Sequence, residues 1–243
     1  MSQYSENNGV KKLLLFILIL FFFYLLFNYI YKQQKKLPEK ISKLEIRGHN
    51  VLTKDNILDL IEMKPGVSFK GLEYAQLEEK LKRHPRVQDA QITRKTQDQL
   101  LVTITEKKTE FIVNTNNSLY EIDQDFNLLS KDDVKERDVC IISGSFRIES
   151  NKIVGVKFKD LVESVRDAFR MFPELQNRIS EIVLNPDGEI VMYIYAPQKI
   201  KVHLGNGFPS KQARKLYATL AYFENKNISA DILDLRGDDA VYH

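Results

Sequence analysis

The chain has 243 residues, of which 43% are hydrophobic, and its formal net charge is +3. This length allows one or two soluble domains in addition to a membrane segment. The small net charge, without a basic stripe that is interleaved with aromatics, argues against nucleic-acid binding. A single cysteine, Cys140, excludes an intramolecular disulfide framework. Because Cys140 lies in an apolar, strand-like run, we expect a buried small hydrophobe rather than a reactive thiol.

The first predicted element is an apolar helix at residues 13–31, which follows a short polar tail at residues 1–12. The stretch carries no charge over about 19 residues, and a helix of that length spans ~29 Å. This matches the ~30 Å hydrocarbon core of a bilayer. Tyr24, Tyr29 and Tyr31 lie toward one end, as expected of an interfacial aromatic belt. The sequence therefore predicts a membrane-spanning helix.

Two alternative interpretations of this stretch fit the sequence less well. A cleaved signal peptide has a shorter apolar region and a small-x-small cleavage site, whereas lysines, glutamines and Pro38 follow here. A buried core helix usually keeps a polar face, and this segment has none. Lys11 and Lys12 precede the helix and Lys32, Lys35 and Lys36 follow it, so charge alone does not favour a cytoplasmic N-terminus.

After a charged linker at residues 32–40, the pattern predicts strand, helix, helix, strand and strand over residues 41–107. Leu44 and Ile46 indicate a short strand that ends at Gly48, and Thr53 is a cap for the first helix. The second helix is predicted from Glu73 to Arg83, before His84-Pro85. Alternating apolar residues predict two further strands, one with Val87, Ala90 and Ile92 and one with Leu101, Val102 and Ile104.

This order and its motifs resemble the POTRA domain of the FtsQ/DivIB bacterial cell-division family. The resemblance rests on five pieces in one order: a strand that ends in Gly48, a capped helix, Pro65-Gly66-Val67-Ser68-Phe69, Leu81 to Pro85, and the strand pair with Val87, Ala90, Ile92, Arg94, Leu100, Val102 and Glu106. The chain departs from the family at Arg86, where Trp is frequent, at Thr96-Gln97, where Trp-Pro is frequent, and at Thr109-Glu110-Phe111, where Pro-Val-Ala is frequent.

Residues 108–243 are predicted to form a mixed β domain with flanking helices, which makes the chain an α+β protein. Short strands precede a helix with Leu161, Val165 and Phe169, and Pro173 ends that helix. Three strands, a helix after Gly205-Asn206-Gly207 and a strand at Ile232 to Arg236 complete the pattern. This run resembles the β domain of FtsQ/DivIB, whose early hairpin usually has a Gly where Asp125-Phe126 stand here.

No reaction centre is evident, so we expect no enzyme, no catalytic residue, no cofactor and no metal. The four histidines are scattered. A lone Gly-x-Gly before a helix is better explained as a structural turn than as a phosphate site. Asp238 and Asp239 are adjacent on an extended segment, so they point to opposite faces rather than forming an acid/base pair.

The resemblance implies a non-enzymatic division scaffold in the inner membrane at the septum, with a single pass, a cytoplasmic N-terminus and extracytoplasmic domains. It implies FtsB-like and FtsL-like coiled-coil partners, other divisome proteins, and a role in the control of septal peptidoglycan synthesis. The alternative is a membrane-tethered POTRA-type binding or chaperone module in envelope protein assembly.

Two partner-binding edges are expected. The resemblance assigns recruitment to the second POTRA strand, with Val87, Ala90, Ile92 and Arg94. A terminal strand has one unpaired side that can template a partner strand. We therefore expect the FtsB-like partner at the end of the chain, where Arg236 would pair with an acidic partner residue. On this prediction, Val241→Pro removes an N–H group and breaks the register of the strand without touching the core. The residues of this edge are Arg236, Gly237, Ala240, Val241 and Tyr242.

Overall fold

The computed structural model describes residues 6–34 and 40–243, and begins with the long helix α1, Glu6–Gln34. Within α1, residues 11–31 are long and apolar enough to cross a membrane. The large apolar side chains from Leu13 to Tyr31 are 42 to 69% exposed, so the described protein does not cover them. A helix that is apolar all round needs lipid or protein around it. Residues 1–5 of the predicted tail and 35–39 of the predicted linker lie outside the described residues.

The next part is a three-stranded sheet with two helices, and its element order is the predicted one. The sheet has the order β1-β3-β2, with β1 parallel and β2 antiparallel to β3. The elements are β1 (Lys43–Arg47), α2 (Lys54–Leu60), α3 (Tyr74–Lys82), β2 (Val87–Arg94) and β3 (Gln99–Glu106). Thr53 caps α2 as predicted, since its hydroxyl accepts from the N–H of Asn56 while the Asn56 side chain accepts from Thr53.

The loop after β1 explains two of the motif residues. Gly48 has a φ of +78°, and a Cβ there would lie 2.0 Å from the carbonyl oxygen of Ile104 on β3. Glu106, at the end of β3, accepts hydrogen bonds from the backbone N–H groups of residues 50, 51 and 52 at 2.8, 2.9 and 3.1 Å. The loop therefore packs directly on β3. Its three backbone N–H groups make no hydrogen bond to the backbone of a described strand, and the carboxylate of Glu106 satisfies them.

The Pro65-to-Phe69 motif closes the membrane-proximal end of this domain. Ile41 donates to the carbonyl of Val67 and Gly66 donates to that of Ile41, both at 2.8 Å. The Phe69 ring lies under the guanidinium of Arg94, 4.0 Å from ring centroid to Cζ. The motif thus joins the residues at which the chain enters this domain, around Ile41, to the tip of the β2–β3 hairpin.

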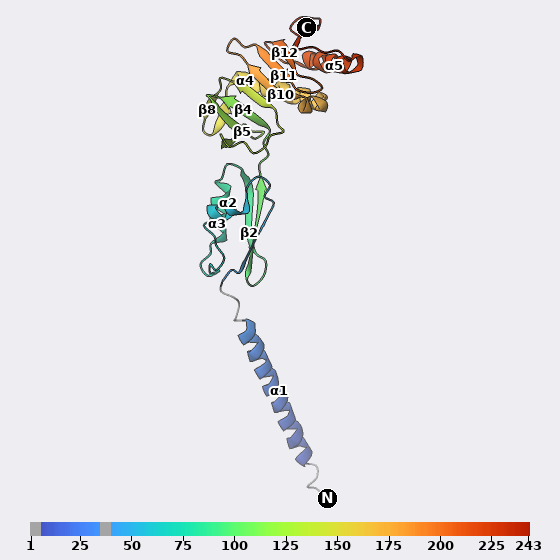
Figure 1. Ribbon diagram of the computed structural model, residues 1–243. Coiled ribbons are helices and arrows are strands. Elements are labelled where there is room, and N and C mark those ends of the chain that lie inside the picture. Colours follow the sequence, from blue (N-terminus) through green and yellow to red (C-terminus); the bar gives the residue numbers. More distant parts are fainter. Residues whose placement is uncertain (1–5, 35–39) are drawn as a thin grey trace.

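The remaining residues form a nine-stranded sheet with helices and a small hairpin. The sheet order is β14-β13-β12-β11-β10-β7-β4-β5-β6, and β8 pairs with β9 separately. In Figure 1 this domain follows the first one, and the C-terminus lies at the end far from α1. Its elements are β4 (Phe111–Thr115), β5 (Ser118–Ile122), β6 (Leu128–Lys131), β7 (Ile141–Gly144), β8 (Arg147–Glu149), β9 (Lys152–Val154), α4 (Val156–Met171), η1 (Pro173–Asn177), β10 (Ile179–Leu184), β11 (Ile190–Ile194), β12 (Ile200–Gly205), α5 (Ser210–Lys226), β13 (Ile232–Asp234) and β14 (Val241–Tyr242).

One core joins α4 and α5 to this sheet. The helices contribute Phe158, Leu161 and Val165 from α4 and Leu216 and Leu220 from α5, all at most 3% exposed. The POTRA-like domain has its own core, built around Ile57, Leu81 and Leu100, and the two cores share no residue. The fold is thus α+β, as expected, with an apolar helix followed by two separately cored parts.

Three local features differ from the sequence prediction. Helix α4 begins at Val156, so Phe158, which the apolar pattern from Leu161 did not include, also enters the core. The β8–β9 hairpin was not predicted; its turn holds Ser150 and Asn151 at φ of 48° and 62°. Phe126 has a φ of 65°, the left-handed conformation that glycine adopts at low cost. Its ring packs edge-on against Phe158 at 5.5 Å, which offsets the backbone cost.

Candidate partner-binding surfaces

The C-terminal strand β14 is the edge strand of the large sheet. It pairs only with β13, through Leu233 opposite Tyr242 and Asp234 opposite Val241. Val241 and Tyr242 are 51 and 42% exposed. The structure therefore places both residues at an open edge, in the position that the sequence predicted for them.

The hydrogen bonds of His243 determine which backbone groups face away from the sheet. His243 donates to the carbonyl of Ile232 at 3.1 Å, and Ile232 donates back at 3.3 Å. In an antiparallel ladder such doubly bonded pairs alternate with non-bonded pairs, so Val241 and Asp234 form the next bonded pair. The N–H and C=O of Tyr242 therefore point to the free edge. Val241→Pro would therefore remove an N–H that faces β13, not one that faces the free edge.

The loop between β13 and β14 is held by helix α5. Lys215 donates through Nζ to the carbonyls of Gly237 and Asp239 at 2.8 and 2.7 Å. Lys211 lies 3.2 Å from a carboxylate oxygen of the exposed Asp238. Strand β14 is short, so these contacts from α5 fix the direction in which the chain returns to the sheet.

A shallow apolar groove of about 300 Å³ lies between α5 and β14. The Tyr242 ring packs edge-on against the buried Phe223 at 5.0 Å between centroids, while Tyr222 is 49% exposed. Aromatic rings that are half covered and half exposed are typical of interaction surfaces. The groove is lined by Lys215, Ala218, Thr219, Tyr222, Phe223, Ala240 and Tyr242.

Arg236 is engaged by carboxylates of its own chain. Its Nε lies 3.0 Å from both oxygens of Asp234, and Nη1 lies 3.4 Å from Glu189. The hydrogen bonds from Arg236 lower the pKa of Asp234 to about 2. Glu189 also contacts Nδ1 of His203 at 3.1 Å. An acidic partner residue would thus compete with Asp234, two positions earlier in the chain, and with Glu189, which directly precedes β11.

Strand β2 is an edge strand of the small sheet, but three of its four predicted residues turn their side chains inward. Val87, Ala90 and Ile92 are each 3% exposed. Lys95 donates to Gln99 at 2.9 Å, so by the same alternation the backbone groups of Ala90, Ile92 and Arg94 point outward. A partner at this edge would meet backbone groups and exposed side chains such as Gln91, not the buried apolar side chains.

One outward donor of β2 already has a partner. Glu78 on α3 accepts from the N–H of Ile92 at 2.7 Å. Asp89 pairs with Lys82 at 2.9 Å, and the hydrogen bond from Lys82 lowers the pKa of Asp89. Such contacts protect a sheet edge against unspecific strand pairing.

The single cysteine is a structural residue. Cys140 is 3% exposed, and burial raises the pKa of its thiol to about 12. The thiol therefore stays protonated and unreactive at neutral pH. Within residues 6–34 and 40–243, no group of three or more His, Cys, Asp or Glu side chains is arranged to hold a metal ion. Gly205, with a φ of +77°, turns the chain from β12 toward α5, as the structural-turn interpretation requires.

The fold and its edges define a class: a membrane-anchored chain with a POTRA module, a type of domain that interacts with proteins and has no enzymatic activity. The family model described as POTRA domain, FtsQ-type, matches residues 39–107. With its apolar N-terminal helix, the chain fits the FtsQ/DivIB family. No curated protein matches the chain. These findings support a role as a division-related or POTRA-type interaction module.

Proposed function

We propose that this chain is a non-enzymatic scaffold of the bacterial divisome, which links early and late division proteins and helps control septal peptidoglycan synthesis. The observation that carries the proposal is the FtsQ-type POTRA match directly after a helix that can span a membrane. The proposed extracytoplasmic parts are a POTRA domain at residues 41–107 and a β domain at residues 108–243.

The proposal assigns a different partner to each exposed edge. Strand β2 of the POTRA domain, with Val87, Ala90, Ile92 and Arg94, recruits the protein to the septum. The recruiting partner pairs with the outward face of its backbone and displaces Glu78 from the N–H of Ile92. Strand β14, with Ala240, Val241 and Tyr242, receives an FtsB-like protein, which in turn associates with an FtsL-like protein. Both are small coiled-coil membrane proteins, so the helix α1 would place all three in one inner membrane.

The decisive experiment combines purification with imaging. We expect the tagged full chain, extracted from the membranes of its own host, to retain two small coiled-coil membrane proteins. A version without residues 41–106 should retain them while losing septal localisation, because the POTRA core and the β-domain core are separate. Normal septal localisation of the deletion would contradict the assignment of recruitment to the POTRA domain. Recovery of outer-membrane assembly proteins instead would favour the chaperone alternative.

We also propose that the N-terminus is cytoplasmic, although lysines flank both ends of α1. A new cysteine at Ser150, an exposed turn residue, should react with an impermeant thiol reagent in intact spheroplasts. A cysteine at Ser5 should not react until the membrane is opened. Both variants carry Cys140→Ser, which removes the buried native thiol. Labelling of position 5 in intact spheroplasts would reverse the orientation.

A further inference from the structure

A buried ion pair crosses the junction between the POTRA and β domains. Arg86, at the start of β2, is 2% exposed, and Glu121, on β5, is fully buried. A guanidinium nitrogen of Arg86 contacts a carboxylate oxygen of Glu121. Arg86 also donates to the hydroxyl of Thr109 at 3.3 Å, in the segment that connects β3 to β4. Two of the positions at which this chain departs from the family pattern, Arg86 and Thr109, thus meet at one point.

Glu121 joins this pair to a loop of the β domain. Its Oε1 accepts from the backbone N–H groups of Lys135 and Glu136 at 3.0 and 2.8 Å, and its Oε2 accepts from the Ser130 hydroxyl. Burial alone would raise the pKa of Glu121, but these hydrogen bonds and Arg86 together lower it. The carboxylate is therefore charged at neutral pH and has partners from both domains.

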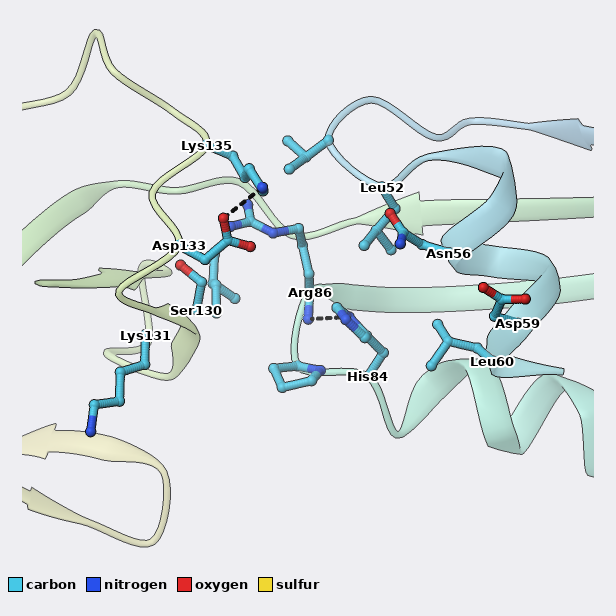
Figure 2. Close-up of a pocket in the computed structure, with 13 residues that line it drawn as sticks. Leu52, Asn56, Asp59, Leu60, His84, Arg86, Ser130, Lys131, Asp133 and Lys135 are labelled. Atoms are coloured by element: carbon cyan, nitrogen blue, oxygen red, sulfur yellow. Dashed lines mark hydrogen bonds and ion pairs between the residues drawn. The ribbon is translucent and has the colours of Figure 1, made fainter. Parts of the chain in front are cut away.

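Few other contacts hold the two domains together. Among the described residues their apolar cores share no residue, and a second, more exposed ion pair joins the domains, between Lys107 and Asp123 at 3.8 Å. Figure 2 shows Arg86 reaching across the cleft between the end of α2, with Asp59 and Leu60, and the loop that carries Asp133 and Lys135. Without apolar packing, the relative orientation depends on polar contacts, and Arg86 makes the most buried of these.

Two clefts with different lining residues open at this junction, and both domains line each of them. One has a volume of about 640 Å³ and the other of about 590 Å³. The first lies between α2 and the loop after β6, and the second lies between the end of β3 and the turn after β5. Open clefts leave room for one domain to rotate against the other, so packing alone does not fix the angle between them.

We infer that Arg86 and Glu121 form an orientation lock that holds the POTRA domain at a fixed angle to the β domain. Rotation that parts the two side chains deprives each buried charge of its oppositely charged partner, which is strongly unfavourable. The lock thereby keeps the edge β2 and the edge β14 of one molecule in a constant spatial relation. A scaffold with two docking edges gains from such a constraint, because bound partners then have defined relative positions.

The test measures the distance between the domains in the full chain, reconstituted in lipid nanodiscs. Nitroxide labels are placed at Glu79→Cys on α3 and Glu163→Cys on α4, both exposed, in the Cys140→Ser background. Double electron–electron resonance should give one narrow distance distribution for this parent. Arg86→Met should at least double the width of the distribution. Lys82→Met is the matched control, since it removes a lysine whose ion pair with Asp89 is exposed and lies within one domain.

A second variant separates loss of the lock from loss of folding. Glu121→Gln keeps the side-chain shape and an oxygen for the N–H groups of Lys135 and Glu136, but it removes the charge that Arg86 needs. We expect the same broadening, with parental hydrogen-exchange protection of β3 and β11. If Arg86→Met loses this hydrogen-exchange protection, its distance distribution no longer reports on the lock. The distance distribution of the folded Glu121→Gln variant then provides the test. A folded variant of either kind with the parental distribution would refute the lock, and no partner protein is needed, so the proposed function is tested separately.

Discussion

Gly48→Ala is expected to unfold the POTRA domain. A Cβ at this position would lie 2.0 Å from the carbonyl oxygen of Ile104, which belongs to the central strand of the small sheet. The φ of +78° adds about 1–2 kcal/mol of strain for an alanine. Because the nearest atom is backbone, relief requires β1 or β3 to move, and Ile46 and Ile104 are both part of the core. We expect a loss of at least ~4 kcal/mol in the free energy of unfolding.

Gly66→Ala provides the matched control for this prediction. Gly66 also has a positive φ, +96°, but a Cβ there would have no neighbour within 4 Å among the residues that the structure describes. This variant should therefore lose only the backbone strain, about 1–2 kcal/mol. Hydrogen exchange of the β1 and β3 amides in the full chain measures both effects. Equal protection in the two variants would show that the close approach of Gly48 to β3 has no energetic role.

The elements of the small domain could be predicted because the sequence patterns that indicate them lie within each element. Thr53 precedes an apolar helical pattern, and the alternation of Val87, Ala90 and Ile92 indicates a strand with one buried face. The same alternation already implied that these side chains face the core. Since the side chains of Val87, Ala90 and Ile92 are each only 3% exposed, a partner at this edge can reach the backbone of β2 but not these side chains.

The junction was not predictable, because its contacts are not local. Arg86 and Glu121 are 35 positions apart, and no periodicity relates a turn residue of one domain to a strand residue of the next. Phe126 shows a second limit: its left-handed backbone follows from a turn in which the Asp123 carboxylate accepts from the N–H groups of residues 125 and 127, both at 2.9 Å. Pattern-based reading gives Phe a strand or core position and misses such a turn.

Tyr242→Pro is expected to weaken binding of the FtsB-like partner at least about tenfold relative to Tyr242→Ala. Both variants lose the ring that packs against Phe223, so the comparison cancels the contribution of the groove. Only proline removes the outward N–H, and its ring also occupies the space where a partner strand would pair. One lost hydrogen bond costs ~0.5–1.5 kcal/mol, and the steric clash adds to it; 1.4 kcal/mol corresponds to about a factor of ten.

Val241→Pro tests the other side of the same strand. Its N–H faces Asp234, so proline there should detach β14 from β13 and expose the β13 edge. We expect this variant to lose hydrogen-exchange protection at Ile232, whose N–H donates to the carbonyl of His243 in the parent, whereas Tyr242→Pro should keep it. Calorimetric titration of each full-length variant with the purified partner in detergent measures the affinities. If Tyr242→Pro binds as tightly as Tyr242→Ala, the partner does not add a strand to β14, and the groove beside α5 is left as the docking surface of this end of the chain.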